Sequence, residues 1–199
     1  MTDVHPADAA LRFIAMYSEV QGAMDSTLRR YLLRTSPRVG RVVGDRLRRL
    51  SDGERVSAMT AIAGDVDAAD HWEAAPAVLT ELKALRDTIG HATLMGAIEN
   101  DDGELRVFAA GNRDPQEFST EQLMTAYARA WWCLEQVIFV ASVAGELAAG
   151  NDVHRRQSGA TLISTPPPFA PADTLPPDPL RVFEVVPEDT EDRDWWEKG

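Results

Sequence analysis

Three polar residues near the middle of the chain, Arg86, Asp87 and His91, have the side-chain types that acid–base chemistry on a phosphate requires. A histidine titrates near neutral pH, so it can take or return the proton of a hydroxyl group. An arginine beside it can stabilise the negative charge that develops on a phosphate oxygen during attack. Asp87 can orient either neighbour by hydrogen bonding. We therefore take Arg86, Asp87 and His91 as the candidate catalytic residues.

These residues lie on a predicted helix that begins near Pro76. Its apolar stripe consists of Val78, Leu82, Leu85, Ile89 and Ala92. At about 100° per residue, Arg86 falls on the flank of this stripe, whereas Asp87 and His91 share a face roughly opposite to it. A glycine such as Gly90 costs a helix about 1 kcal/mol relative to alanine. We therefore expect another helix or a ligand to approach Gly90 closely.

A basic segment is the second candidate site. Eight arginines lie between Arg29 and Arg49, with the single acid Asp45, in a chain whose net charge is −12. That net charge argues against nucleic acid covering the whole surface, but arginine binds phosphate well through paired hydrogen bonds. The candidate RNA-binding residues are Arg38, Arg41, Arg46, Arg48 and Arg49. The alternative is a solvated helical face with no ligand.

Other chemistries find little support in the sequence. The four histidines and Cys133 show no metal-ligand spacing, so we expect no metal. Gly40 and Gly44 lack the lysine that a phosphate-binding loop needs, and we expect no cofactor. Cys133 lies in an apolar run, where a buried thiol is the expected structure.

The elements that must position these residues are mostly helical. The spacing of apolar residues predicts helices over about 7–33, 37–50, 51–66, 76–95 and 119–147. Capping boxes mark the starts at Ser51 and Ser119. Residues 97–99 and 104–108 alternate like strands and predict a hairpin. The fold class is therefore all-α: an antiparallel helical bundle with a small β-hairpin insertion. We expect residues 67–75 to form a connection. Within it, we expect the Trp72 side chain to be buried in the core; the less favoured alternative is that it anchors an interface with another molecule.

The composition changes after residue 150, which divides the chain into a bundle domain over 1–150 and a Pro-rich acidic tail over 151–199. Eight of the twelve prolines lie between Pro166 and Pro187, so we expect a flexible, disordered tail with one short strand at 180–186. Residues 188–197 are acidic and contain Trp195 and Trp196. This segment is either a docking peptide for a protein partner or a solubilising end. A further hypothesis is that it folds back on Arg29–Arg49 and competes with RNA.

The chain has no apolar run of 18 or more residues, so we expect no membrane span. The first residues lack the basic start and apolar core of a signal peptide. A cytoplasmic location is therefore the expectation.

The stretch Arg86-Asp87-Thr88-Ile89-Gly90-His91 resembles the motif of the HEPN superfamily, small helical-bundle proteins often found in prokaryotic toxin and antiviral systems. In that motif an arginine, usually followed by a polar residue, precedes a histidine after four to six intervening residues. The surroundings are also similar: a capped apolar helix, a small hairpin, then one long closing helix. The resemblance covers about residues 7–149. Thr93 stands where one toxin branch, which pairs with minimal nucleotidyltransferases, has tyrosine, so that branch is not assigned.

The resemblance implies a metal-independent endoribonuclease whose site forms where two subunits bring their motifs together. Arg86 and His91 diverge by about 140° on an ideal helix, so a homodimer would oppose them better than one copy. Many members of the superfamily are not catalytic, and the alternative is an interaction module whose tail recruits a partner. A third interpretation is an unrelated helical protein, in which Arg86 pairs with Glu81 or Asp87 and His91 is a surface histidine.

Overall fold

The structure, a computed structural model, describes residues 4–36, 38, 46–47, 49–92, 94–99, 105–110 and 115–148. Two predictions lie outside these residues: the tail over 151–199 with its short strand, and most of the arginine-bearing helix over 37–50. Within the described residues, the expected all-α bundle with a small β element is confirmed.

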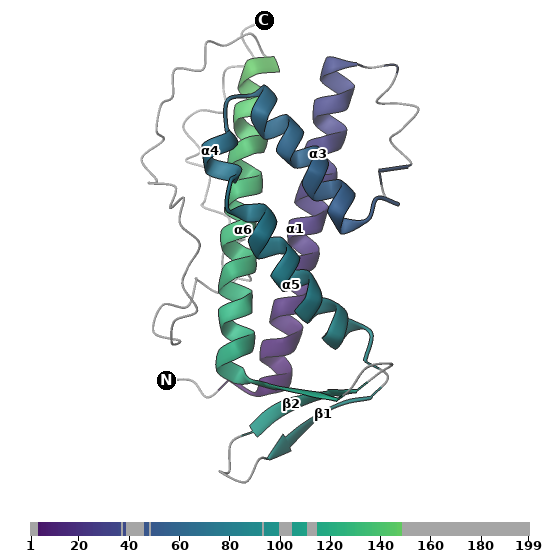
Figure 1. Ribbon diagram of the computed structural model, residues 1–199, viewed down its shortest axis with the longest axis vertical. Coiled ribbons are helices and arrows are strands. Elements are labelled where there is room, and N and C mark those ends of the chain that lie inside the picture. Colours follow the sequence, from purple (N-terminus) through teal and green to yellow (C-terminus); the bar gives the residue numbers. More distant parts are fainter. Residues whose placement is uncertain are drawn as a thin grey trace, which may run out of the picture.

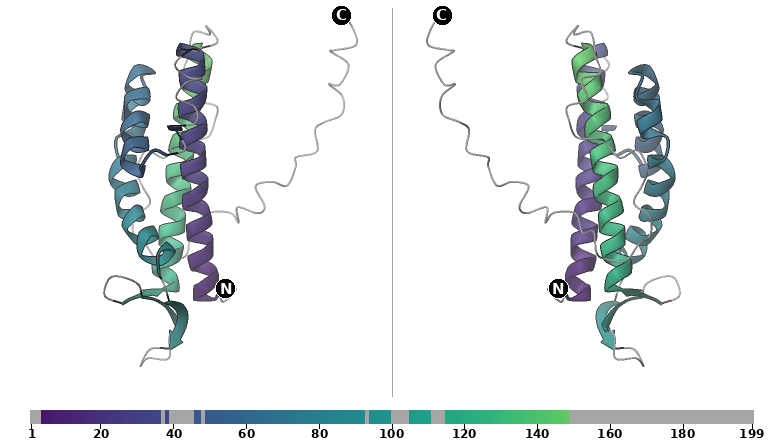
Figure 2. Two further views of the ribbon diagram at one scale, coloured as in Figure 1. Left: turned by 90° about the vertical axis from the view of Figure 1, so that its right-hand side faces the viewer. Right: turned by 90° about the vertical axis from the view of Figure 1, so that its left-hand side faces the viewer.

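The helices form two layers. Helices α1 (Pro6–Thr35) and α6 (Thr120–Ala148) lie side by side, and α3 (Asp52–Asp65), α4 (Ala69–Trp72) and α5 (Ala75–Gly90) pack on one face of this pair (Figure 1, Figure 2). Each long helix buries an apolar stripe, so most of the core lies where the two layers meet.

The two long helices run in the same direction. Both begin beside the sheet (Figure 1), and Arg34 near the end of α1 donates to the carbonyl of Gly145 near the end of α6 over 3.0 Å. Helix α5 runs opposite to both, since Arg86 near its end lies beside Tyr17 in the first half of α1. Helix α5 is therefore antiparallel to α1 and α6, as predicted, whereas α1 and α6 are parallel to each other. The long pair is parallel because the elements between them return the chain to the end where α1 begins.

Local sequence sets the helix starts as predicted. The Ser51 hydroxyl accepts from the Glu54 amide over 3.3 Å, and the Ser51 amide donates to the Glu54 carboxylate over 2.7 Å. Ser119 and Gln122 exchange the same two bonds at the start of α6, over 3.1 and 2.9 Å. Each box satisfies amides that a helix start leaves without partners.

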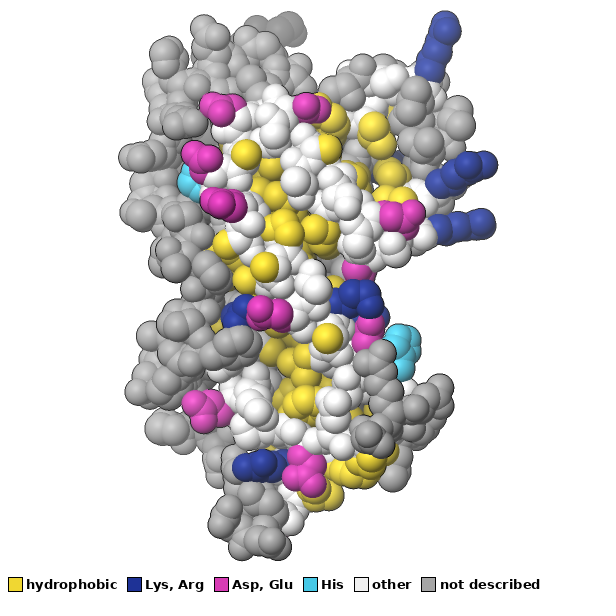
Figure 3. Space-filling view, viewed as in Figure 1, with side chains coloured by type: hydrophobic (Ala, Val, Ile, Leu, Met, Phe, Trp, Pro, Cys, Tyr) yellow, Lys and Arg dark blue, Asp and Glu magenta, His cyan; other side chains and the backbone are white. Residues whose placement is uncertain are grey.

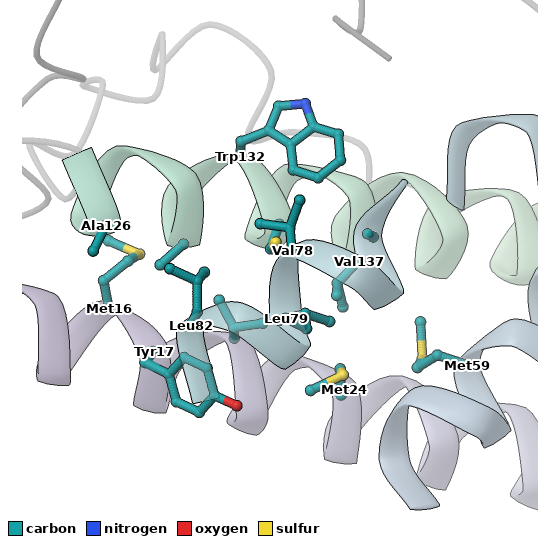
Figure 4. Close-up of a cluster of buried hydrophobic side chains, with 14 of the residues drawn as sticks. Met16, Tyr17, Met24, Met59, Val78, Leu79, Leu82, Ala126, Trp132 and Val137 are labelled. Carbon is teal, nitrogen blue, oxygen red and sulfur yellow. The ribbon is translucent and has the colours of Figure 1, made fainter. Parts of the chain in front are cut away.

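Large apolar side chains from α1, α3, α5 and α6 meet in the interior (Figure 4). Those labelled there are Met16, Tyr17, Met24, Met59, Val78, Leu79, Leu82, Ala126, Trp132 and Val137. Trp72 from α4 is 1% exposed, and its indole Nε1 donates to the Thr60 hydroxyl over 2.9 Å, so it is the predicted core plug. Cys133 is buried as predicted, and burial raises the pKa of its thiol.

A three-stranded antiparallel sheet lies across the end at which α1 and α6 begin (Figure 1). Strands β1 (Leu94–Glu99) and β2 (Leu105–Ala110) form the predicted hairpin, with Ala97 opposite Val107. On β2 the alternate residues Val107 and Ala109 are buried, so one face of the strand packs on the helices.

One local prediction was wrong, and two short elements were not predicted. Helix α5 ends at Gly90 rather than near residue 95, because the residues from 94 onward pair with β2 instead. Strand β3 (Gln116–Ser119) was not predicted, and it pairs with β2 just before the α6 capping box. The connection over 67–75 contains the one-turn helix α4.

Candidate functional site

Arg86, Asp87 and His91 lie in and just after the last turns of α5, and they have very different surroundings. On the face shown in Figure 3, basic, acidic and histidine side chains gather at mid-height along the right-hand edge. The side chain of Arg86 is 23% exposed and that of Asp87 is 26% exposed, whereas that of His91 is 75% exposed. The predicted flank position of Arg86 and surface position of His91 are therefore confirmed.

The guanidinium of Arg86 turns inward, toward α1 and α3. Its Nη2 donates to Oδ2 of Asp52 over 2.7 Å, and its Nη1 lies 2.9 Å from Oδ1 of Asp87. The guanidinium carbon lies 5.2 Å from the centre of the Tyr17 ring, a distance at which the ring's negative face attracts a cation. The buried Nε of Arg86 has no hydrogen-bond partner among the described residues. Arg86 is thus held by two carboxylates and one aromatic ring.

Asp52, the first residue of α3, joins three helices. Its carboxylate accepts from the Tyr17 hydroxyl over 3.2 Å, from the Gln21 amide over 2.5 Å and from Nη1 of Arg55 over 3.3 Å, besides Arg86. The Asp52 side chain is 9% exposed, and a carboxylate so buried needs several donors to replace its water. Burial first, and then the Asp52 charge, raise the pKa of the Tyr17 hydroxyl, so Tyr17 stays protonated and donates.

The ion pairs continue beyond Asp52. Arg55 donates two hydrogen bonds to the Asp25 carboxylate of α1, over 2.7 Å from Nε and 3.1 Å from Nη2. The Asp25 hydrogen bond is the main cause of a raised pKa for the Arg55 guanidinium. Acids and bases therefore alternate along a continuous series from Asp25 through Arg55, Asp52 and Arg86 to Asp87, which crosses α1, α3 and α5.

Asp87 connects this series to the surface. It accepts from Arg86 and from Lys83, one turn earlier on α5, and its Oδ1 lies 3.9 Å from Nε2 of His91. Burial alone would raise the pKa of the Asp87 carboxyl, but the Lys83 hydrogen bond and the neighbouring positive charges hold it below its ordinary value. Asp87 is therefore an ionised carboxylate beside an exposed imidazole.

His91 is the residue that caps the end of α5. Its amide donates to the carbonyl of Asp87 over 3.1 Å, while its side chain projects outward. We expected a close neighbour at Gly90, but a methyl group added there would meet only the Arg86 side chain, at an ordinary contact distance of 3.7 Å. Among the described residues, no other helix therefore approaches Gly90 closely, and its place as the last residue of the helix is one where a glycine costs little.

The predicted RNA-binding arginines are only partly described. Arg38, Arg46 and Arg49 are exposed, whereas Arg41 and Arg48 lie outside the described residues. Arg49 precedes Asp52 by three residues, so the chain keeps their Cα atoms within about 11 Å of each other. Because Asp52 binds Arg86, at least this arginine lies near the candidate catalytic residues.

Sequence reasoning missed Asp52, Tyr17, Gln21 and Arg55. Tyr17 and Gln21 fall in the predicted helix over about 7–33, and Asp52 and Arg55 fall in the capped helix that follows Ser51, with no further role predicted. Glu81, proposed as a partner of Arg86, instead accepts from Arg129 of α6 over 2.6 Å. No local signal points to Asp52, because an acid in the first turn of a helix is already accounted for by the helix dipole.

Among residues 4–36, 49–92 and the other described ranges, no three His, Cys, Asp or Glu side chains gather to hold a metal ion. In the same part of the chain, no helix combines the length and apolar character needed to cross a membrane. Comparison of the chain with protein-family models, with curated proteins and with solved structures finds no match in any of the three.

Proposed function

We propose that this protein is a metal-independent endoribonuclease of the HEPN type, with a site shared across a homodimer. The supporting observation is the continuity of three groups: the exposed His91 imidazole, the Asp87 carboxylate 3.9 Å from it, and the Arg86 guanidinium bound to the same carboxylate. Imidazole, carboxylate and guanidinium are the groups that phosphodiester cleavage by a neighbouring hydroxyl uses.

In the proposed reaction, a ribose 2′-oxygen attacks the adjacent phosphorus and the bond to the leaving 5′-oxygen breaks. The His91 imidazole takes the proton of the 2′-hydroxyl, and the imidazolium that forms returns that proton to the leaving oxygen. Asp87, which lies beside both His91 and Arg86, orients the His91 imidazole. Arg86 stabilises the additional negative charge on the phosphate.

A second copy of the chain completes this site. His91 points outward while Arg86 turns toward Asp52, so one copy does not oppose the two groups across a single phosphate. Two copies related by a twofold axis near the end of α5 would set the His91 of each beside the Arg86 of the other.

The exposed arginines near the start of α3 fit this proposal as contacts for the RNA backbone, since Arg49 is close in the chain to Asp52. The proposed setting is the cytoplasm, in a toxin or antiviral defence role. A protein partner that binds residues 151–199 would be a natural means of control.

One observation favours a second candidate, a non-catalytic HEPN-like interaction module. Both terminal nitrogens of Arg86 are bound to carboxylates, so its charge is already offset by Asp52 and Asp87. In that case the ion-pair series holds α1, α3 and α5 together, and His91 has no chemical role.

The deciding experiment incubates purified protein with a mixed-sequence RNA in EDTA, beside the variants His91→Ala and His5→Asn. His5 caps α1 through its Nδ1, and asparagine is a good cap, so His5→Asn removes an imidazole while preserving the fold. We expect wild type and His5→Asn to cut RNA and His91→Ala to be at least about 100-fold slower. Intact RNA in every sample would favour the interaction module, and equal cutting by His91→Ala would exclude this site.

A further inference from the structure

A groove opens between the two long helices on the side away from α3. It is lined by Ala23, Ser26, Thr27 and Arg30 of α1 and by Val137, Ile138, Ala141 and Ser142 of α6. Asp25 and Tyr31 of α1 bind residues of α3, and on an ideal helix the mean direction of Ser26 and Arg30 is roughly opposite to the mean direction of that pair. The groove therefore faces away from the second layer, on the side of the α1–α6 pair that no described element covers (Figure 2).

The groove has an apolar floor and a size suited to side chains. Ile138 is 52% exposed, one of two large hydrophobic residues so exposed in the described part of the chain. Small residues, Ala23 and Ala141, line it alongside Ile138, which leaves space above the buried Val137. The volume is about 270 Å³. Small-molecule sites usually begin at about 300 Å³, so an inserted aromatic side chain is a better fit than a metabolite.

The part of α1 that borders the groove is basic: Arg30 lines the groove, and Arg29 is its neighbour in the chain. Arg29, Arg30 and Arg34 follow Asp25, and no acid occurs from residue 26 to residue 36. Asp25 is itself neutralised by Arg55, and Arg34 is bound to a carbonyl of α6. Arg29 and Arg30 are exposed. An occupant of the groove should therefore carry acids next to its aromatic group.

The chain itself contains such a segment. Residues 188–197 hold six acids, one arginine and the pair Trp195–Trp196. Ser142 lies six residues before the end of α6, or about 9 Å along the helix axis. Residues 149–187 then connect α6 to the segment, and even as a random coil 39 residues span about 30 Å or more. Such a connection gives an effective concentration on the order of millimolar, so a weak contact within one chain would be well populated.

We propose that this groove receives one indole of Trp195–Trp196 from the same chain, while acids of residues 188–197 pair with Arg29 and Arg30. The proposal does not depend on ribonuclease activity. It assigns the acidic segment to the α1–α6 groove, away from the face that presents His91.

The test is crosslinking in the full-length protein. The paired variant Ser142→Cys, Lys198→Cys places one thiol in the groove and one beside the tryptophans without removing an acid. The matched control, Ser57→Cys with Lys198→Cys, places the first thiol on the exposed surface of α3. Cys133 is buried and its thiol pKa is raised by burial, so it should not compete for a short thiol crosslinker.

We expect the Ser142 pair to form a crosslink within one chain at least about 10-fold faster than the Ser57 pair. The added changes Trp195→Ser with Trp196→Ser, or Arg29→Glu with Arg30→Glu, should abolish this preference, and roughly 0.5 M salt should reduce it. Equal rates at the two positions would overturn the proposal, as would rates insensitive to the tryptophans. Crosslinks formed only between two chains would assign the groove to a second copy instead.

Discussion

At the scale of single residues, the carboxylate of Asp52 determines how Arg86 is presented. It is buried and accepts from four side chains of three helices, so it keeps the guanidinium against the Tyr17 ring. A buried charge with this many donors is costly to remove, because its cationic partners lose their compensation.

We predict that Asp52→Ala lowers the free energy of unfolding by about 3–5 kcal/mol. Asp70→Ala, a change of the same kind at an exposed position on α4, should alter it by less than about 0.5 kcal/mol. Urea denaturation monitored by circular dichroism measures both. A loss below about 1 kcal/mol for Asp52→Ala would mean that water readily replaces this carboxylate.

Asp87 should contribute to stability in a pH-dependent way. Its pKa in the folded protein is held below its ordinary value of 3.8, so its contribution is present above that value and is lost as the pH falls through the folded pKa. We predict that the melting temperature falls less between pH 6 and pH 3 in Asp87→Asn than in wild type, while the control Asp70→Asn matches wild type. An unchanged fall in Asp87→Asn would contradict the assignment.

The position of His91 on an exposed face follows from helical periodicity, and it could be predicted from the sequence. The Asp52–Arg86 pair could not, because 34 residues separate its members and no local pattern records which acid a distant arginine will meet. Of the two acids considered as partners of Arg86, the adjacent Asp87 is confirmed, whereas Glu81 binds Arg129, 48 residues away, which no local pattern indicates.

At the scale of elements, the capping boxes show what local sequence determines. Ser51 and Ser119 begin α3 and α6 where predicted, since each box needs only residues three apart. The end of α5 was misplaced because it depends on a partner strand that follows later in the chain. Residues 94–95 continue the apolar pattern of α5, yet their backbone pairs with Ala109 and Ala110 of β2.

We predict that Ser51→Ala lowers the free energy of unfolding by about 1 kcal/mol, because the Glu54 amide loses its acceptor. Ser57→Ala, on the exposed middle of the same helix, should be neutral or slightly stabilising, since alanine is the better helix former. Thermal unfolding compares the two. Equal losses would show that the cap contributes nothing beyond helix propensity.

At the scale of the whole molecule, the proposed homodimer can be tested by mixing two inactive variants, because a site shared between two subunits can regain activity in a mixed dimer. The variants Arg86→Met and His91→Ala should each be inactive on RNA. If each site uses Arg86 of one subunit and His91 of the other, mixed dimers carry one intact site, and an equal mixture should regain up to about a quarter of wild-type activity. No recovery, despite mixed dimers detected by mass spectrometry, would place both residues of a site in one subunit.

The bundle and its small β element were predictable because apolar periodicity identifies each helix by itself. The parallel course of α1 and α6 was not, since it depends on the number and length of the elements between them. Most of residues 37–50 and all of residues 151–199 lie outside the described residues. The helix predicted to carry Arg41 and Arg48 and the roles predicted for the acidic segment therefore remain predictions from the sequence.

The pairing of α1 with α6 also bears on how the chain is made. Arg34 is synthesised 111 residues before Gly145, which at ordinary rates of translation is roughly 6 to 22 seconds. The first helix therefore leaves the ribosome that much earlier than its principal neighbour, and until α6 follows, the side of its stripe from Phe13 to Leu28 that packs on α6 is open to water or to a chaperone. The nascent protein is therefore most vulnerable to aggregation just before its last helix emerges.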